Sequence, residues 1–249
     1  KMQKKLGQLM GLLLRKGYIK DPQVLFAAVG DARCDRVPLQ VGQFESDVAM
    51  DDDLTTFVLE GGGGGQNTES YEDALYFFGH RTDIDCYEKR GKKGYLFLIG
   101  DEKPYVRSGK EELQALIADD VQDGVSIKDI VKAAQEKYNV FFIIPKGTSH
   151  YHDPVLRETW QALIGPQNVI MLEEPGAVCE LIGSTIGLLE GNLDAGGIAS
   201  DLADVGASTA IVRAVTGGLD DLIKSGALVK AATGTLPDKA GGGTSVTRL

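Results

Sequence analysis

The sequence predicts an α/β fold with a mostly parallel sheet flanked by helices. Continuous apolar runs of strand length recur along the chain, helical patterns separate them, and two of the runs stop at a Gly-Asp pair. Runs that are apolar throughout are typical of strands buried on both faces, as in parallel sheets. We therefore expect right-handed crossovers and a doubly wound, Rossmann-like sheet whose ligands are held at the loops after the strand ends.

The expected elements follow one another along the chain. The first 16 or so residues have apolar positions at helical spacing, and Gly17 ends this helix. Strands buried in the sheet are expected at Val24–Val29, Tyr95–Ile99, Val140–Ile144 and Val169–Leu172, with a half-exposed edge strand at Leu39–Phe44. Helices are expected near residues 50–59, 70–78, 109–118, 126–137, 154–163 and 175–189, with one or two short ones within 205–228.

The composition changes near residue 190. Residues 1–190 carry the alternation of strands and helices, whereas residues 191–249 are rich in Gly, Ala, Asp, Ser and Thr. We expect one α/β domain over 1–190 and a C-terminal extension over 191–249, with short helices and a flexible tail.

Charge and cysteine content limit the classes of partner. The 249 residues carry a formal net charge of -10, which repels phosphate backbones and disfavours nucleic acid as a partner. Three widely spaced cysteines offer no disulfide framework, which fits a reducing, cytoplasmic compartment. The apolar stretches are interrupted before the ~20 residues that a membrane span needs, so we expect no membrane segment.

Two of the expected strands end in Gly-Asp, at Gly30-Asp31 and Gly100-Asp101. Each pair places a carboxylate at the carboxyl end of a strand, after a glycine that permits close approach of the backbone. An aspartate in this position can instead cap a turn or a helix.

A glycine run, Gly61–Gly65, precedes the helix expected from residue 70. The run lacks the Gly-Lys-Ser/Thr ending of a phosphate-binding loop. The loop supplies oxygen atoms from Thr68 and Ser70, among others, and such ligands suit a hard cation such as Mg²⁺. The alternative is a surface loop in which Ser70 only caps the helix.

These features together resemble the von Willebrand factor A fold. The loop from Gly61 to Ser70 resembles the second metal-binding loop of that family, and Leu98-Ile99-Gly100-Asp101 resembles the third. The short polar strand near residues 39–44 resembles the family's edge strand, which is typically antiparallel. The resemblance implies a metal-ion-dependent adhesion site that uses Asp101 and a hydroxyl from Thr68 or Ser70, with Asp31 at the same edge of the sheet.

The family's first metal motif, Asp-x-Ser-x-Ser after a central strand, does not occur in this sequence. A sheet without its central strand leaves two interior edges unpaired. Three explanations are open: the chain is a fragment or processed product, a partner chain supplies the strand, or the late run Ala210–Val215 fills the place.

The resemblance favours a binding module over an enzyme. It implies a protein-interaction module that binds partners through Mg²⁺ at the loop edge, and the partners of related bacterial intracellular domains include AAA+ ATPases and other multi-protein machines. Metal affinity should be weak if the first motif is absent. The alternatives are a metal-dependent hydrolase or nucleotide-binding enzyme that uses Asp31, Asp101 and the Gly61–Gly65 loop, and a structural subunit with a vestigial metal site.

Overall fold

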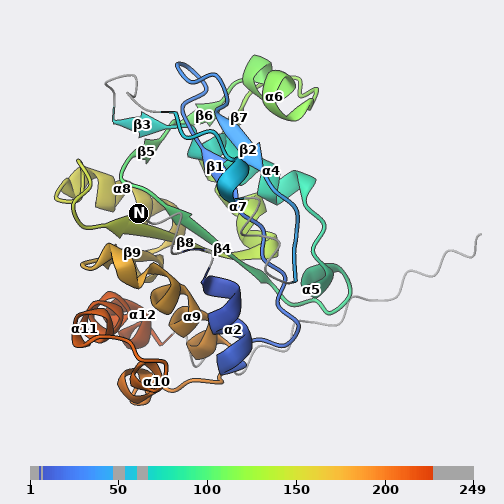
Figure 1. Cartoon of the computed structure of the whole chain (residues 1–249). Helices are drawn as coiled ribbons and strands as arrows, with labels where there is room; N and C mark the ends of the chain where they lie inside the picture. The colour runs from blue at the N-terminus through green and yellow to red at the C-terminus, as the bar shows by residue number, and fades with distance from the viewer. Residues whose placement is uncertain (1–5, 7, 47–53, 61–66, 227–249) are drawn as a thin grey trace, which may run out of the picture.

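The computed structural model describes residues 6, 8–46, 54–60 and 67–226. The fold is mixed α/β, with parallel strands flanked by helices on both faces (Figure 1). The expected glycine run at 61–65 and the tail beyond 226 lie outside the described residues.

A three-stranded parallel sheet forms the centre of the fold, in the order β4-β8-β9. Its strands are β4 (Gly94–Ile99), β8 (Tyr138–Pro145) and β9 (Val169–Leu172), close to the ranges expected from the sequence. Gly94 pairs with Tyr138 and Phe142 with Val169. Because helices cover both faces, the apolar run in β8 is buried almost throughout.

Helices cover the two faces of this sheet and form two separate cores (Figure 1). One core contains Phe142 and Trp160, and its helices are α4 (Tyr71–Arg81), α6 (Lys110–Ile117), α7 (Ile127–Lys137) and α8 (Pro154–Ile164). The other contains Phe141 and Ile143, and its helices are α2 (Leu9–Lys16), α9 (Val178–Leu189), α10 (Ile198–Asp204), α11 (Thr209–Gly218) and α12 (Asp220–Lys224). Alternate residues of β8 therefore serve opposite cores, as the pleat of a strand requires.

The expected capping residues act as predicted at two helices. Gly17 ends α2 with a φ of 60°, a left-handed conformation that favours glycine. The Asp153 side chain accepts a hydrogen bond from the Val155 N–H, and Pro154 occupies the first turn of α8.

The remaining elements are short. A four-residue helix α5 (Asp85–Glu88) precedes β4. Two small sheets lie beside the main one: β3 (Thr68–Glu69) runs parallel to β5 (Lys103–Pro104), and β6 (Arg107–Ser108) runs antiparallel to β7 (Val125–Ser126). Short 3₁₀ turns η1 (Pro166–Asn168) and η2 (Pro175–Ala177) flank β9.

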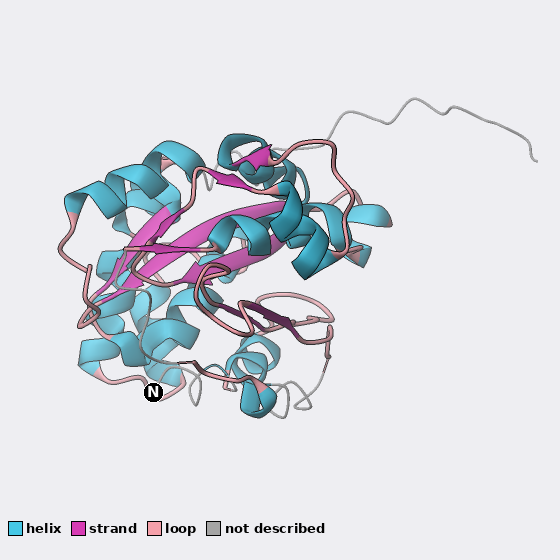
Figure 2. Ribbon diagram, turned by 90° about the horizontal axis from the view of Figure 1, so that it is seen from above, coloured by secondary structure: helices cyan, strands magenta, loops and turns pink. Residues whose placement is uncertain are grey.

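The expectation for Val24–Val29, a strand buried on both faces in the parallel sheet, is wrong. The strand β1 covers only Ala27–Val29, is half-buried, and pairs antiparallel with β2 (Leu39–Val41). Figure 2 shows this hairpin set apart from the three long strands. The physical reason is that no described strand lies between β1 and β4, so one edge of β1 has no neighbour. The antiparallel edge strand expected near residue 39 is confirmed.

The possibility that Ala210–Val215 fills the sheet is also wrong, because these residues lie within the helix α11. Ala214 and Val215 pack in the same core as α9, and α10 contributes Ile198 and Leu202. Among the described residues no helix is both long and apolar enough to cross a membrane.

Candidate functional site

The loop after β1 and the start of α4 meet at the carboxyl ends of the strands. The Ala32 N–H donates a hydrogen bond of 2.9 Å to Ser70 Oγ. The Tyr105 hydroxyl donates to Asp31 Oδ2 over 3.0 Å. A Cβ atom on Gly100 would collide with the Tyr71 hydroxyl, so the end of β4 approaches the same place closely.

Asp31 is 4% exposed and acts as the cap of a turn. Its Oδ1 accepts from the Arg33 N–H at 2.9 Å, while Oδ2 accepts from Tyr105. The bond from the Arg33 N–H matches the alternative offered by the sequence, in which this aspartate caps a turn. The preceding glycine is required here, because a Cβ on Gly30 would collide with the Asp35 carboxylate.

The other predicted residues lie at the same edge with different partners. Ser70 is 2% exposed and occupies the position before α4, but its side chain makes no capping hydrogen bond there. Thr68 lies in β3, where it pairs with Lys103. Asp101 Oδ2 accepts a hydrogen bond from the His150 N–H at 2.9 Å.

Three of the residues expected to hold Mg²⁺ accept hydrogen bonds within the chain. Asp31 and Ser70 accept hydrogen bonds from backbone N–H groups or from Tyr105, and Asp101 Oδ2 accepts one from the His150 N–H. Within the described part of the chain, no group of three or more His, Cys, Asp or Glu side chains is placed to hold a metal ion. The Gly61–Gly65 loop lies outside the described residues.

Negative charge gathers at this edge of the sheet. Burial, together with the nearby carboxylates of Glu102, Asp31 and Asp35, raises the pKa of Glu69 to about 7. Burial and Asp101 likewise raise the pKa of Glu102. Glu69 Oε1 is buried without a hydrogen-bond partner. A cation beside Glu69 would therefore be favourable at neutral pH.

A small polar cavity of about 160 Å³ opens beside Glu69. Three carboxylates line it, those of Asp35, Glu60 and Glu69. Its wall includes Ala28 and Val29 of β1, which also line a second and much larger cavity. We call the small one the acidic pocket.

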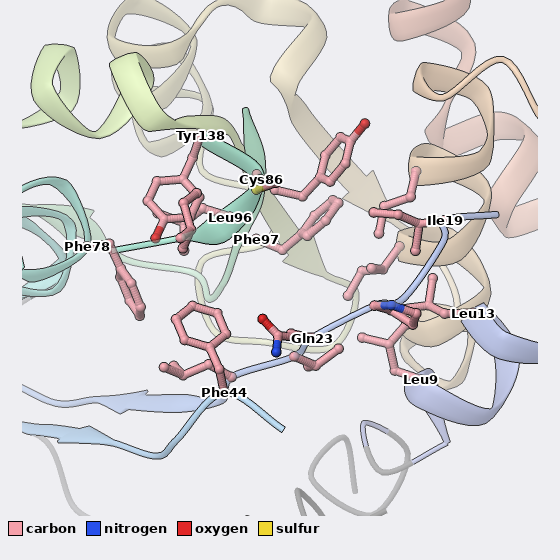
Figure 3. Close-up of a pocket in the computed structure, with 18 of the residues that line it drawn as sticks. Leu9, Leu13, Ile19, Gln23, Phe44, Phe78, Cys86, Leu96, Phe97 and Tyr138 are labelled. Carbon is pink, nitrogen blue, oxygen red and sulfur yellow. The ribbon is translucent and has the colours of Figure 1, made fainter. Parts of the chain in front are cut away.

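The large cavity has a volume of about 1150 Å³ and lies between β4 and the segment Val24–Val29. We call it the strand slot. Figure 3 shows Phe78, Leu96 and Tyr138 on one side of it and Leu9, Leu13 and Ile19 on the other. Apolar side chains of one core therefore line each face of the slot, and charged residues such as Asp83, Lys92 and Glu190 also line the cavity.

The two strands that border the slot run in the same direction. Asp31, just after β1, lies beside Tyr105, and the adjoining Ala32 bonds to Ser70. Tyr71, next to Ser70, contacts Gly100 at the end of β4. Because both strands end at one place, β1 and β4 are parallel, although no described strand joins them.

Hydrogen bonds show which backbone groups face the slot. The Gly100 N–H donates to the Ile143 carbonyl in β8, so the even-numbered residues of β4 direct their backbone N–H and C=O groups toward β8. The Gly42 N–H donates to the Phe26 carbonyl, and Val24 exchanges two hydrogen bonds with Glu45, so the even-numbered residues of the first segment face β2. On both borders, the odd-numbered residues direct their backbone N–H and C=O groups toward the slot: Leu25, Ala27, Val29, Tyr95, Phe97 and Ile99.

Sequence reasoning missed two buried carboxylates in the first turn of α4. Glu72 and Asp73 are each 1% exposed. Glu72 Oε2 accepts from the Tyr105 N–H at 2.9 Å, and Asp73 accepts from the Ser108 hydroxyl. Burial raises the pKa of Glu72 to about 8. Acidic residues in a first helical turn are favoured by the helix dipole even when exposed, and nothing local in the sequence signals that α4 is covered on nearly every side.

No protein-family model, no curated protein and no solved structure matches this chain.

Proposed function

We propose that this chain is a protein-interaction module, similar in architecture to the von Willebrand factor A domain, that accepts an extended strand of a partner protein in the strand slot. The observation that carries the proposal is the pair of parallel strand edges, without a strand partner among the described residues, on either side of a largely apolar cavity. Binding by strand addition is a common way for proteins to recognise extended peptides.

The backbone of the slot supports a strand as occupant. Six residues turn their N–H and C=O groups toward it, three from each border, and no described residue forms a hydrogen bond with these groups. These six residues are half-buried, and an inserted strand would bury their backbone groups together with hydrogen-bond partners. One inserted strand would offer partners to both borders, since successive residues of a strand direct their backbone groups to opposite sides.

The size and lining of the slot favour an apolar strand over a small molecule. Its volume of about 1150 Å³ exceeds the roughly 300–1,000 Å³ of typical small-molecule pockets. The bordering ranges 25–29 and 95–99 each contain five residues, which matches a strand of about five or six residues, or about 17–20 Å. Because apolar side chains lie on both faces of the slot, the occupant should be apolar at successive positions rather than alternating.

The resemblance to the von Willebrand factor A family supports the same proposal. The order β2, β1, slot, β4, β8, β9 has an antiparallel edge strand and a place for one more strand in the interior. With that place filled, the sheet would be doubly wound. A partner of the AAA+ type, a cytoplasmic location and an additional role for Mg²⁺ at the loop edge remain parts of the proposal that rest on the sequence.

A peptide of about six Val and Ile residues tests the proposal. We expect it to bind the whole chain, measured by fluorescence anisotropy with a labelled peptide. The matched control has the same side chains but N-methyl groups at every second residue, which removes the donors that face one border. We expect the control to bind at least tenfold more weakly. Equal binding of the two peptides would mean that the slot takes apolar material without strand pairing, and would overturn the proposal.

A substitution in β1 gives an independent test. Ala27→Pro removes an N–H that faces the slot and leaves the hydrogen bonds between β1 and β2 in place. We expect weaker peptide binding with an unchanged midpoint of thermal unfolding. The matched variant Ala28→Pro removes an N–H that faces β2 and should instead lower that midpoint.

A further inference from the structure

The acidic pocket continues the strand slot at its carboxyl end. The two cavities share Ala28 and Val29 as walls. A strand that lies in the slot parallel to β1 and β4 therefore ends beside the carboxylates of Asp35, Glu60 and Glu69. Sheets whose strands are all parallel are common, and both borders of the slot run toward this end.

The three carboxylates have no cationic partner in the described chain. None of the ion pairs among the described residues includes them. The nearby Arg33 stacks over the Tyr105 ring at 3.6 Å and lies 3.9 Å from Glu112. Glu60 Oε1 accepts the N–H groups of Arg36 and Val37, and Asp35 Oδ2 accepts that of Asp31.

Each carboxylate keeps an oxygen that the backbone does not use, and Glu69 Oε1 is buried without a partner. Three carboxylates around one small cavity repel each other, and a positive charge placed among them removes that repulsion. The volume of about 160 Å³ corresponds to about five water molecules, which is enough for the end of a long side chain.

We propose that the strand accepted by the slot carries a lysine or arginine directly after its apolar run, and that this side chain binds the acidic pocket formed by Asp35, Glu60 and Glu69. This inference rests on the proposed function and adds the orientation and the charge of the partner segment. The cationic side chain fixes the strand parallel to β4 and fixes its register, because the apolar run must end where the pocket begins.

Three peptides with the same apolar run test the inference. One carries Arg-Lys after the run, one carries Arg-Lys before it, and one carries Gln-Gln after it. Binding is measured by fluorescence anisotropy at low and at high salt. We expect the first peptide to bind at least tenfold more tightly than the third, with an advantage that shrinks as salt screens the charges.

Variants of the pocket separate charge from general apolar binding. Glu69→Gln combined with Glu60→Gln should reduce the advantage of the basic peptide to about twofold or less and leave binding of the Gln-Gln peptide unchanged. The control Glu158→Gln, an exposed carboxylate on α8, should change neither. The advantage should also grow between pH 6 and pH 8, because the pKa of Glu69 is about 7 and its ionised form attracts the cation.

The outcomes distinguish the two proposals. Equal affinity of all three peptides would overturn the inference about the pocket and leave strand acceptance standing. Tighter binding of the peptide with Arg-Lys before the run would overturn the parallel orientation. Failure of every peptide, including the N-methyl pair, would overturn the proposed function itself, and a stable dimer of the chain that excludes peptide would show that a second copy occupies the slot.

Discussion

The two edges of β4 lie in contrasting surroundings, although the segments that face them are similarly apolar. On one side β8 pairs with β4 along its full length, from Gly94 to Ile99. On the other side the apolar segment Val24–Val29 is separated from β4 by the strand slot. We call the region around β8 the closed half and the region around the slot and β1 the open half. Nearly every residue of β8 is buried, whereas Ala27–Val29 is only half-buried.

This difference shows that an apolar run determines burial only when neighbouring elements complete its environment. Residues 140–144 gain a strand on each edge and helices on both faces. The segment 24–29 gains a strand on one edge only, so its hydrogen bonds are satisfied by β2 and its other edge stays open. A partner strand would make the open half resemble the closed half.

The largest contrast should come from truncating one phenylalanine in each half. Phe142 is fully buried and stacks on Trp160 with a centroid distance of 4.0 Å, so Phe142→Ala should lower the free energy of unfolding by about 3–5 kcal/mol. Phe97 is half-buried and already borders the strand slot. Phe97→Ala should cost about 1–2 kcal/mol, because it leaves little new cavity. Urea denaturation measures both, and equal losses would contradict an open half.

A second contrast concerns Glu72 and Glu69, whose pKa values are both raised. Glu72 is 1% exposed, and burial raises its pKa to about 8, so its neutral form is favoured in the folded chain. Its contribution to stability is complete below the unfolded pKa of about 4.3 and is lost as pH rises toward 8. Because of this group, the free energy of unfolding should be on the order of 3 kcal/mol higher at pH 5 than at pH 8.

Glu72→Gln should remove most of this pH dependence, as measured by denaturation at each pH. Glu69→Gln is the control in the open half. Its pKa is about 7, but the side chain is only half-buried, so solvent screens it and the change should be smaller. A larger effect for Glu69 than for Glu72 would contradict the assigned burial.

Hydrogen exchange of alternate amides in β4 sharpens the comparison within a single strand. The N–H groups of Leu96 and Leu98 face β8, whereas that of Phe97 faces the slot. We expect the Phe97 amide to exchange about a hundredfold faster than its two neighbours. Binding of the apolar peptide should slow Phe97 and leave Leu96 and Leu98 nearly unchanged. Equal protection in the free chain would mean that the slot edge is already paired.

The sequence predicted the closed half well and the open half in part. The runs at 95–99, 140–144 and 169–172 are strands of the expected parallel sheet, because each pairs with at least one other strand of that sheet and packs against helices. The run at 24–29 has the same local pattern, and its pairing depends on what lies in the slot. Local patterns do not carry that information.

The candidate site shows the same division. The Gly-Asp pairs indicated which edge of the sheet collects charge, and Asp31 and Ser70 do lie together there. The Asp31 bond from the Arg33 N–H is the local turn cap that the sequence offered as an alternative. The Ser70 bond from the Ala32 N–H could not be predicted, since it depends on how two segments distant in sequence pack. The acidic pocket was missed because Asp35, Glu60 and Glu69 come from three separate segments.

The smallest expected effect is that of Mg²⁺ on the free chain. Because Asp31, Asp101 and Ser70 already accept hydrogen bonds from the protein, we expect weak binding at the open edge. A cation present at a concentration equal to its Kd stabilises the fold by only about 0.4 kcal/mol, which raises the Tm of a chain of this size by about 1–2 °C. Differential scanning fluorimetry with millimolar Mg²⁺ or EDTA measures this shift, and Asp101→Ala should abolish it.

A rise of more than about 5 °C, equivalent to over 1 kcal/mol, would instead indicate a complete metal site that includes ligands outside the described residues. The same titration can be repeated with the basic peptide bound. A lysine or arginine in the acidic pocket should reduce the Tm shift caused by Mg²⁺, because the two cations would compete for the same negative field.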